Sequence, residues 1–249
     1  MRAKSTPKRL DALVVERGLA DSLPKAQAMI LAGEVSVDGA RADKAGSRFP
    51  QESRIEVTSR TGKYVSRGGQ KLEGALQDFA VEPTERICLD IGSSTGGFTD
   101  CLLQHGAARV YAVDVNVDQL AWKLRQDTRV VRISRNARDL RPADIPEPID
   151  LVTIDVSFIS VRKILPSAVA VAKPGADLLI LIKPQFELPR PDVGPGGIVS
   201  DTVLHQKAVS AVRESTAKLA LEILGVCPSH LPGAEGNQEY FLHLRKPLR

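Results

Sequence analysis

The chain has 249 residues and a formal net charge of +4, with 43% hydrophobic and 26% charged residues. These proportions are typical of a folded globular protein and exclude a wholly disordered or collagen-like chain. No apolar run approaches the about 20 residues of a membrane-spanning helix, so the sequence also argues against an integral membrane protein.

The positive charge is concentrated in the amino-terminal third. Residues 1–75 contain 14 Lys and Arg residues against 9 Asp and Glu residues, which gives +5 there and −1 over the remainder. This asymmetry favours a polyanion-binding segment joined to a neutral one, and the alternative is a basic, solvated surface without a partner. No apolar run follows the basic amino terminus, so we expect no secretory signal.

Two short helices and a small hairpin sheet are expected within the first sixty residues. Apolar residues recur at helical spacing over 9–17, and Gly18 then provides a helix end. A second helix is expected over 22–33, and the alternating segment 35–39 runs into an Asp-Gly hairpin turn. A further short strand is expected at 55–57.

Three motifs in this part of the chain resemble the S4 RNA-binding domain over residues 8–58. They are RLD at 9–11, S-x-x-K-A at 22–26 and GEVSVDG at 33–39. The resemblance implies that the helix pair presents basic residues to structured RNA, although Leu23 stands where the family often has an arginine. The expected RNA contacts, here and in the basic segment that follows, are Lys8, Arg9, Lys25, Arg41, Lys63 and Arg67.

A domain boundary is expected where Gly, Ser and basic residues dominate the segment SRTGKYVSRGG at 59–69. We therefore divide the chain into a small α+β domain at 1–60, a linker at 61–69 and a larger domain at 70–249. An amphipathic helix in QKLEGALQDF is expected to open the larger domain.

Strands and helices alternate from residue 86 onward, which predicts an α/β fold with a Rossmann-like, doubly wound and mostly parallel sheet. Ligands of such sheets bind beyond the carboxyl ends of the strands. The last apolar run is expected to return as an antiparallel strand. The expected strands are 87–91, 110–115, 130–133, 151–156, 178–182 and 240–244, and the expected helices lie near 97–105, 118–124, 160–172 and 203–224.

A glycine-rich turn, DIGSSTGGFT at 90–99, begins at the end of the first of these strands. It lacks the lysine of a phosphate loop, and Ser94 occupies the second glycine of a dinucleotide fingerprint. Asp90 before the turn indicates a ligand with a positive centre, and Asp114 ends the next strand, where a carboxylate can accept ribose hydroxyls. S-adenosylmethionine fits both features, and the alternative is a sheet that binds no nucleotide.

The expected cofactor contacts extend from this turn to the ends of the neighbouring strands. Asn136, after the third strand, could contact the adenine or cap its own loop. The full set is Asp90, Gly92, Ser93, Ser94, Thr95, Gly96, Gly97, Phe98, Asp114, Asn136 and Asp155.

The glycine-rich turn resembles the D-x-G-x-x-P-G-G-F motif of FtsJ-like methyltransferases, with Thr95 in place of proline. Together with the S4-like segment, four further motifs resemble the TlyA family along nearly the whole chain. They are VSRGGQKL at 65–72, DVSFIS at 155–160, IKPQFE at 182–187 and GNQEYF at 236–241. The resemblance implies an S-adenosylmethionine-dependent methyltransferase that modifies the 2′-hydroxyl of a cytidine in 23S rRNA, 16S rRNA or both, although members are often labelled haemolysins.

The same resemblance implies a catalytic tetrad of Lys71, Asp155, Lys183 and Glu239. A ribose hydroxyl holds its proton tightly at neutral pH, so Lys183 would either remove that proton or position the hydroxyl, and the sequence leaves both open. Phe158 and Phe186 could stack on a flipped base or belong to the core. The Pro- and Gly-rich segment 185–200 could cover the site.

Three functions are compared on these grounds. The first is methyl transfer to rRNA or ribosomal subunits, with S-adenosylmethionine as cofactor. The second is a non-catalytic RNA-binding or ribosome-assembly protein, which the four filled tetrad positions argue against. The third is a pore-forming haemolysin, which would need a segment long enough to span a bilayer. The three cysteines form no C-x-x-C pair and the four histidines lack ligand spacing, so we expect a cytoplasmic protein without a metal site.

Overall fold

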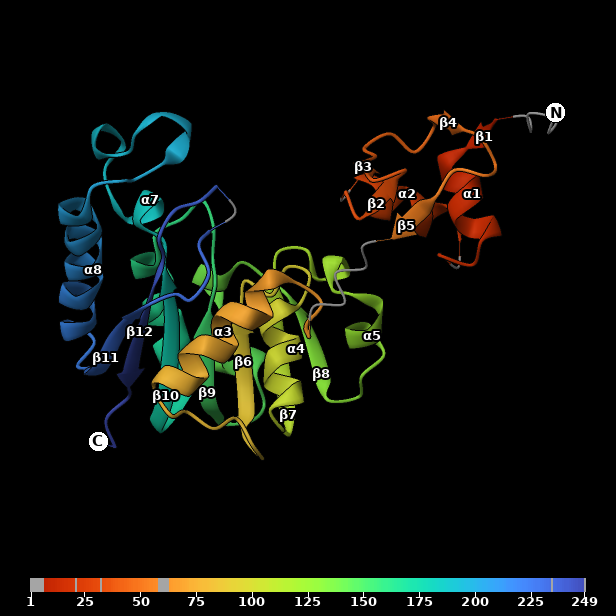
Figure 1. Ribbon diagram of the computed structural model, residues 1–249. Helices are drawn as coiled ribbons and strands as arrows, with labels where there is room; N and C mark the ends of the chain where they lie inside the picture. Colours follow the sequence, from red (N-terminus) through yellow and green to blue (C-terminus); the bar gives the residue numbers. More distant parts are fainter. Residues whose placement is uncertain (1–6, 21, 32, 58–62, 234, 249) are drawn as a thin grey trace, which may run out of the picture. The chain divides into compact units, whose positions relative to one another are not determined.

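The computed structural model describes residues 7–20, 22–31, 33–57, 63–233 and 235–248. The chain forms two compact units, residues 1–62 and 63–249 (Figure 1). The expected linker residues 61 and 62 lie outside the described residues, as do residues 1–6, 21, 32 and 58–60 of the expected first domain. Residues 63–69 of that linker belong to the second unit, where Tyr64 is buried and a helix already begins at Arg67.

The first unit packs helices against small antiparallel sheets. Its described elements are β1 (Lys8–Arg9), α1 (Leu10–Glu16), α2 (Leu23–Leu31), β2 (Val35–Val37), β3 (Ala40–Arg41), β4 (Arg48–Phe49) and β5 (Ile55–Val57). Leu10 and Val14 of α1 share an apolar cluster with Ile30 of α2. The turn from β2 to β3 has positive φ at Asp38 and Gly39, 51° and 83°, as a two-residue hairpin requires. The helices and the hairpin confirm the expectation, whereas the pairing of β1 with β4 is not foreseen.

The second unit is built on one sheet. Its described strands are β6 (Ile87–Ile91), β7 (Arg109–Asp114), β8 (Val130–Ser134), β9 (Ile149–Ile154), β10 (Ala172–Ile182), β11 (Glu222–Pro228) and β12 (Tyr240–Arg245). Their order is β11-β12-β10-β9-β6-β7-β8. The strands from β8 to β10 run parallel, and β12 returns antiparallel between β10 and β11. The expected doubly wound sheet and its antiparallel return are confirmed.

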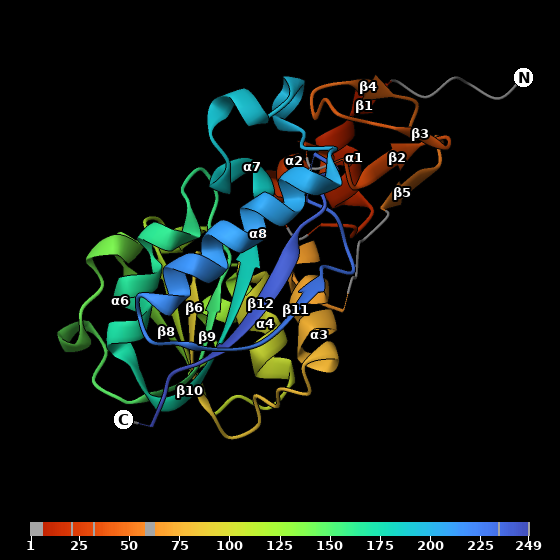
Figure 2. The same ribbon diagram turned by 90° about the vertical axis from the view of Figure 1, so that its left-hand side faces the viewer.

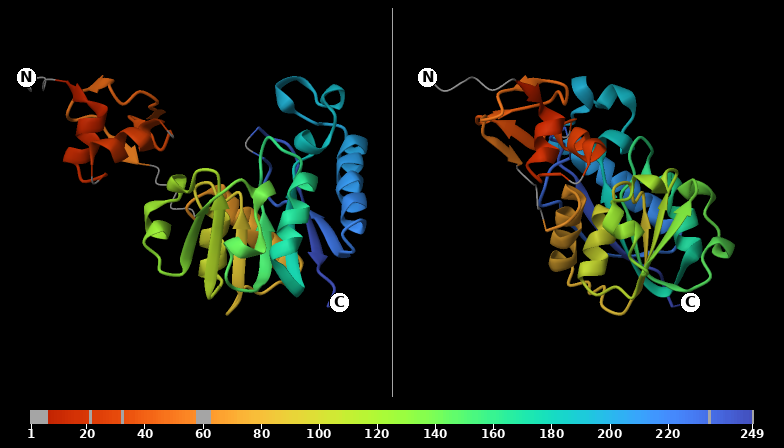
Figure 3. Two further views of the ribbon diagram at one scale, coloured as in Figure 1. Left: turned by 180° about the vertical axis from the view of Figure 1, so that it is seen from behind. Right: turned by 90° about the vertical axis from the view of Figure 1, so that its right-hand side faces the viewer.

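Helices cover both faces of this sheet (Figures 2 and 3). The described helices are α3 (Arg67–Asp78), α4 (Gly97–Gln104), α5 (Trp122–Arg125), α6 (Leu165–Val171), α7 (Pro184–Glu187) and α8 (Thr202–Ala217), with short 3-10 turns η1 (Val117–Gln119), η2 (Ala137–Asp139), η3 (Pro142–Asp144), η4 (Val161–Lys163), η5 (Arg190–Asp192) and η6 (Pro195–Gly197). Leu151 of β9 packs in one apolar cluster with Leu72 of α3. Its neighbour Val152 packs in the other cluster, with Leu165 of α6 and Val212 of α8. Both faces are buried, so the strands read as continuous apolar runs.

Two of the expected helices are wrong in part. The helix expected over 203–224 stops with α8, and β11 follows where the helix was to continue. Between them Ala220 has a φ of 53°, which a continuing right-handed helix cannot contain. The helix expected near 118–124 is divided, because Leu120 and Ala121 adopt extended ψ angles of 134° and 142° between η1 and α5.

Within the described residues, each helix is too short or too polar to cross a membrane. The same residues contain no group of three or more His, Cys, Asp or Glu side chains placed to hold a metal ion.

Candidate functional site

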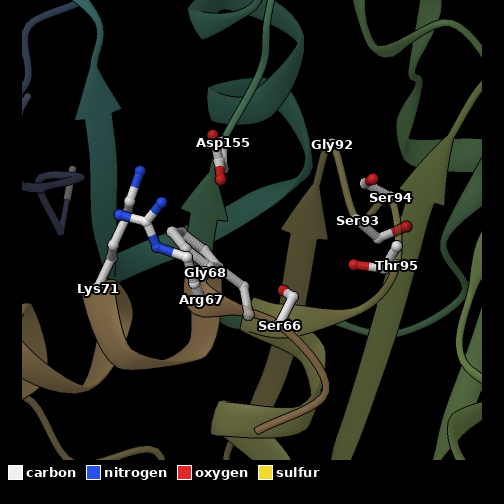
Figure 4. Close-up of a pocket in the computed structure, with 11 residues that line it drawn as sticks. Ser66, Arg67, Gly68, Lys71, Gly92, Ser93, Ser94, Thr95 and Asp155 are labelled. Atoms are coloured by element: carbon white, nitrogen blue, oxygen red, sulfur yellow. The ribbon is translucent and has the colours of Figure 1, made fainter. Parts of the chain in front are cut away.

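A cavity of about 190 Å³ opens at the carboxyl ends of β6 and β9 (Figure 4). Three segments build its wall: the start of α3, the glycine-rich turn between β6 and α4, and the residue that follows β9. The carboxyl ends of parallel strands meet at one edge of a sheet, so these segments converge there. The lining residues are Ser66, Arg67, Gly68, Lys71, Gly92, Ser93, Ser94, Thr95, Gly97, Phe98 and Asp155.

Close backbone contacts shape the glycine-rich turn. Gly92 has a φ of 85°, and a Cβ there would collide with the carbonyl of Asp155 at the end of β9. A Cβ on Gly97 would collide with Ser66 at the start of α3. Glycine at these two positions therefore lets both neighbouring segments approach the turn, so that all three segments line one cavity.

Asp90 lies outside the described lining of the cavity, at the base of the turn. Its carboxylate is fully buried and accepts hydrogen bonds from Thr99 Oγ1 at 2.6 Å and Thr153 Oγ1 at 3.2 Å. The pKa of this carboxyl is raised to about 7, mainly by burial and in part by the charge of Asp155, against the lowering effect of the hydroxyl hydrogen bonds. The contacts of Asp90 therefore hold the turn in place.

Asp114 and Asn136 also bond to backbone groups near the site. Asp114 Oδ2 accepts from Ser94 N at 2.9 Å and its Oδ1 accepts from Asn116 N at 3.0 Å, so this carboxylate fixes the turn from the neighbouring strand. Asn136 Oδ1 accepts from Arg138 N at 3.1 Å and caps η2, which is the capping alternative. The expected cofactor contacts that lie outside the described lining are Asp90, Gly96, Asp114 and Asn136.

One buried hydroxyl of the turn lacks a partner. Ser93 is 4% exposed and lines the cavity, and its Oγ has no hydrogen-bond partner among the described residues. A buried group left unpaired costs about 1–3 kcal/mol, so a polar ligand group at this wall would relieve that cost. The start of α3, at Arg67 and Gly68, forms another wall, where a helix amino terminus favours negative charge. The sequence analysis did not assign this wall to the cavity.

The four residues of the expected tetrad form two ion pairs. Lys71 Nζ lies 2.5 Å from Glu239 Oε2, and both side chains are buried. Lys183 Nζ lies 2.5 Å from Asp155 Oδ1 and donates a hydrogen bond to Ser157 Oγ at 2.9 Å. Lys71 and Asp155 line the same cavity, so each pair contributes one residue to it (Figure 4). Adjacent strands position Asp155, Lys183 and Glu239, because β10 pairs with both β9 and β12, and α3 carries Lys71.

Glu187 joins the loop after Asp155 to the segment after Lys183. This carboxylate is 5% exposed. Its Oε1 accepts from Val161 N at 2.7 Å, and its Oε2 accepts from Ser160 Oγ at 2.6 Å. The two segments that carry one ion pair are therefore tied together by a buried carboxylate that the sequence analysis did not single out.

Asn237 makes a second such link, between the Pro- and Gly-rich segment and the turn that precedes Glu239. Its carboxamide is buried. The Oδ1 atom accepts from Val199 N and the Nδ2 atom donates to Gly197 O, both at 2.8 Å. The segment that could cover the site is thus fastened to the side chain of Asn237, two residues before Glu239.

Phe158 stands in solvent beside these groups. Its side chain is 91% exposed, and its ring centroid lies 5.3 Å from that of the partly buried Phe186. Its φ of 63° is strained for a residue other than glycine. Phe158 therefore does not belong to the core, and an exposed aromatic ring next to Ser157 is suited to stacking on a base.

The expected RNA contacts of α1 and its surroundings are paired with carboxylates. Lys8 Nζ lies 2.8 Å from Glu16 Oε2. Arg9 Nη2 lies 2.6 Å from the buried Asp11, and its hydrogen bonds hold the pKa of that carboxyl down at about 2. Arg9 therefore also has a structural role in the first unit.

The remaining expected RNA contacts differ in their surroundings. Lys25 and Arg41 are exposed, in α2 and β3. Lys63 forms an ion pair with Glu73 of α3. Arg67 donates to a backbone carbonyl at 3.0 Å and lines the cavity. Lys63 and Arg67 thus belong to the second unit, and Arg67 lies at the candidate site itself.

Comparisons with known proteins agree with both parts of this description. A family model for FtsJ-like methyltransferases matches residues 64–246, and one for the S4 domain matches residues 8–55. The chain is 47% identical over 239 residues to the 16S/23S rRNA (cytidine-2′-O)-methyltransferase TlyA of Mycobacterium tuberculosis, covering 95% of this chain and 89% of that protein. It is 43% identical over 237 residues to Hemolysin A of Brachyspira hyodysenteriae, covering 94% and 98%. A solved structure from Streptococcus thermophilus, named as a hemolysin, aligns with a TM-score of 0.75 at 39% identity, covering 97% of this chain and 89% of that one.

Proposed function

The chain belongs to the TlyA family of FtsJ-like methyltransferases with an S4 domain, and on this premise we propose that it transfers a methyl group from S-adenosylmethionine to the 2′-hydroxyl of a cytidine in ribosomal RNA. The observation that supports this most is the placement of two lysine–carboxylate pairs, each with one member lining a cavity beyond the strand ends. Such pairs can hold and polarise a hydroxyl group beside a bound cofactor.

The cavity fits the methionyl part of S-adenosylmethionine. The unpaired Ser93 hydroxyl and the amino terminus of α3 at Arg67 and Gly68 suit its carboxylate. Asp155 in the lining suits its positive centres. Each oxygen of Asp114 accepts one backbone N–H and keeps a lone pair for a ribose hydroxyl. When bound, this cofactor supplies an activated methyl group.

Lys183 acts in this proposal as a charged residue that positions the hydroxyl. Its Nζ lies 2.5 Å from Asp155 Oδ1, and an ammonium in such an ion pair can donate to the ribose oxygen but cannot take its proton. When S-adenosylmethionine supplies the methyl group, the hydroxyl would lose its proton to a neighbouring carboxylate, and Asp155 would accept it. Alignment of the oxygen with the methyl group then accounts for most of the acceleration.

The first unit serves in this proposal as the docking module. The S4 domain match and the exposed Lys25 and Arg41 support a contact with structured RNA, together with Lys8, Arg9, Lys63 and Arg67. The partner is ribosomal RNA or a ribosomal subunit, which places the reaction in the cytoplasm. Phe158 would stack on an unpaired base at or beside the target nucleotide, because exposed aromatic rings bind unstacked RNA bases.

Methyl transfer from labelled S-adenosylmethionine to unmethylated ribosomal subunits tests this proposal. We expect label on a ribose 2′-oxygen, identified by nuclease digestion and mass spectrometry. Lys183→Ala should lower the transfer rate at least about a hundredfold, because the positioned donor is lost. The matched control is Lys173→Ala, which removes an exposed lysine from the other end of the same strand.

Label on a base, or no label on any RNA from a protein that still binds the cofactor, would overturn the proposal. The second result would favour the ribosome-assembly alternative. Lysis of red cells by Lys183→Ala, without methyl transfer by the unsubstituted protein, would favour the haemolysin reading that the Brachyspira relative's name suggests.

A further inference from the structure

Trp122 is the single tryptophan of the chain, and it is 68% exposed at the first residue of α5. Tryptophan is a large apolar side chain that is highly buried on average, so exposure of this extent points to a partner. The segment around Trp122 is held by buried side chains on either side of it in the sequence. Leu120 and Leu124 are only 1% and 3% exposed, so they anchor the backbone while the indole stays in solvent.

Two basic residues lie near the exposed indole, Arg125 against its ring and Lys123 next to it in the chain. The guanidinium carbon of Arg125 lies 5.3 Å from the ring centroid of Trp122, a cation–π contact that covers one face of the ring. Lys123 is exposed, and its ammonium lies 2.9 Å from Asp100 Oδ2. The indole therefore keeps 68% of its surface in solvent, with the Arg125 guanidinium near its ring and an ion-paired lysine beside it in the chain. An aromatic ring binds flat π-systems and basic side chains bind negative charges. Nucleic acid offers both, in its bases and its phosphates.

The segment that carries the indole is attached to the rim of the candidate site. Ala121 N donates to the carbonyl of Thr95, a lining residue of the cavity, at 3.1 Å. A Cβ on Gly96 would collide with Leu124, so the turn and α5 are in close contact. Trp122 itself lies outside the described lining of the cavity. Figure 1 shows α5 beside β8, at the edge of the sheet opposite to β10 and β12, the strands next to Lys183 and Glu239.

We propose that Trp122 is an RNA-stacking residue of the methyltransferase unit. An unpaired base near the target nucleotide stacks on the open face of the indole, while Arg125 and Lys123 contact the neighbouring phosphates. This inference rests on the proposed function and adds to it. The second unit makes its own contacts with the RNA, in addition to those of the first unit. Stacking is tolerant of base identity, so this contact contributes affinity and orientation rather than sequence preference.

Intrinsic fluorescence tests the inference directly, because every photon of indole emission comes from Trp122. In the free protein the emission should be that of a water-exposed indole and should be quenched readily by acrylamide. Titration of the full chain with an unmethylated rRNA fragment should reduce the emission and protect the residue from acrylamide. S-adenosylhomocysteine alone should leave both signals unchanged.

RNA binding that leaves the emission and the acrylamide quenching unchanged would overturn the inference. Loss of emission on adding S-adenosylhomocysteine alone would also overturn it, because Trp122 would then cover the cofactor. Both results remain distinct from failure of the proposed function, which would show as a lack of methyl transfer by the same unsubstituted protein.

Substitution provides the second measurement. Trp122→Ala should weaken RNA binding about tenfold and raise KM for RNA while the cofactor Kd stays constant, and Trp122→Phe should restore most of the affinity because it retains a stacking ring. The matched control is Val203→Ala, which removes an exposed apolar side chain from α8. An effect of Trp122→Ala no larger than that of the control would contradict the assignment.

Discussion

Glu187 lies outside the tetrad, yet its contacts determine where two tetrad residues stand. The carboxylate accepts from the backbone of Val161 and the hydroxyl of Ser160, on the loop that follows Asp155. Arg162 adds an ion pair with Nε at 3.1 Å, and Glu187 itself lies four residues after Lys183. A positioning residue of this kind acts on the alignment of Asp155 with Lys183 rather than on substrate.

Glu187→Ala is therefore expected to lower kcat by about a hundredfold, because a displacement of about 1 Å at reacting groups has effects of that size. The cofactor Kd should change little, since Glu187 lies outside the described cavity lining. Single-turnover methylation and calorimetric titration measure the two quantities.

Glu187→Gln should recover part of the lost rate, because an amide oxygen still accepts from Val161 N. Asp192→Ala is the matched control, as it removes a carboxylate that pairs with Lys207 on the surface. A parallel fall of kcat and of cofactor affinity in Glu187→Ala would contradict positioning and indicate general loss of structure.

At the scale of elements, the start of α3 is held against the glycine-rich turn by the absence of a side chain at Gly97. A Cβ there would meet Ser66 Oγ and would lie 3.0 Å from Gly69 N and 3.2 Å from Gly68 Cα, so the backbone of α3 would have to move. We expect Gly97→Ala to destabilise the protein by about 1–3 kcal/mol and to weaken cofactor binding about tenfold. Denaturant unfolding and calorimetry measure the two effects.

Gly68→Ala provides the comparison for stability. A Cβ at Gly68 would lie 3.4 Å from Phe98 Cδ1 and from Ser66 Oγ, which is ordinary van der Waals contact. Its stability should match that of the unsubstituted protein within about 0.5 kcal/mol. Equal stabilities of the two variants would show that the contact of α3 with the turn is not limited by side-chain volume.

The sequence predicted the central strands well because both of their faces are buried, so that β10 ends in a continuous apolar run at 178–182 with Lys-Pro after it. It failed at β11, whose alternate residues are exposed at the sheet edge. A strand that is buried on one face only and directly follows a helix has a mixture of polar and apolar residues that fits either a continuing helix or a strand. The divided helix at η1 and α5 failed for a related reason, since Leu120 and Leu124 are both buried and keep helical spacing through the break.

The candidate site was predictable only in part. The tetrad positions and the glycine-rich turn came from motifs, and the structure places Lys71 and Asp155 in one cavity with most of that turn. The wall at Ser66 and Gly68 could not be found from spacing, because it depends on how α3 packs across the turn. Glu187 is part of the IKPQFE motif. Its hydrogen-bond partners Ser160 and Val161 lie about 26 residues earlier in the chain, and no local sequence pattern reveals such a contact.

At the scale of the whole molecule, the net charge of the first unit is smaller than the net charge of the amino-terminal third of the sequence. Residues 1–62 carry 11 basic and 8 acidic residues, a net of +3, whereas the first 75 residues carry +5. The difference comes from Lys63, Arg67, Lys71 and Glu73, in the residues that lead to the cavity of the second unit. The positive charge is therefore shared between the proposed docking unit and the rim of the proposed reaction site.

Deletion of residues 1–62 should accordingly weaken rRNA binding by at least about tenfold and reduce its dependence on salt, because fewer phosphate contacts release fewer counterions. Binding of S-adenosylhomocysteine should persist, since the cavity lining lies wholly within the second unit. Filter binding at two salt concentrations and calorimetry test this. Loss of cofactor binding in a truncated protein that still unfolds cooperatively would contradict a division of labour between the units.

The buried pair of Lys71 and Glu239 joins residues that are 168 positions apart in the chain. Lys71 is made early, whereas Glu239 immediately precedes β12, which enters the sheet between β10 and β11. During synthesis the site therefore stays incomplete until Glu239 and β12 have left the ribosome, and contacts of such long range form late and slowly. A nascent or carboxy-terminally truncated chain would carry a finished docking unit but an open reaction site. The order of synthesis would thus complete the proposed docking unit before the proposed reaction site.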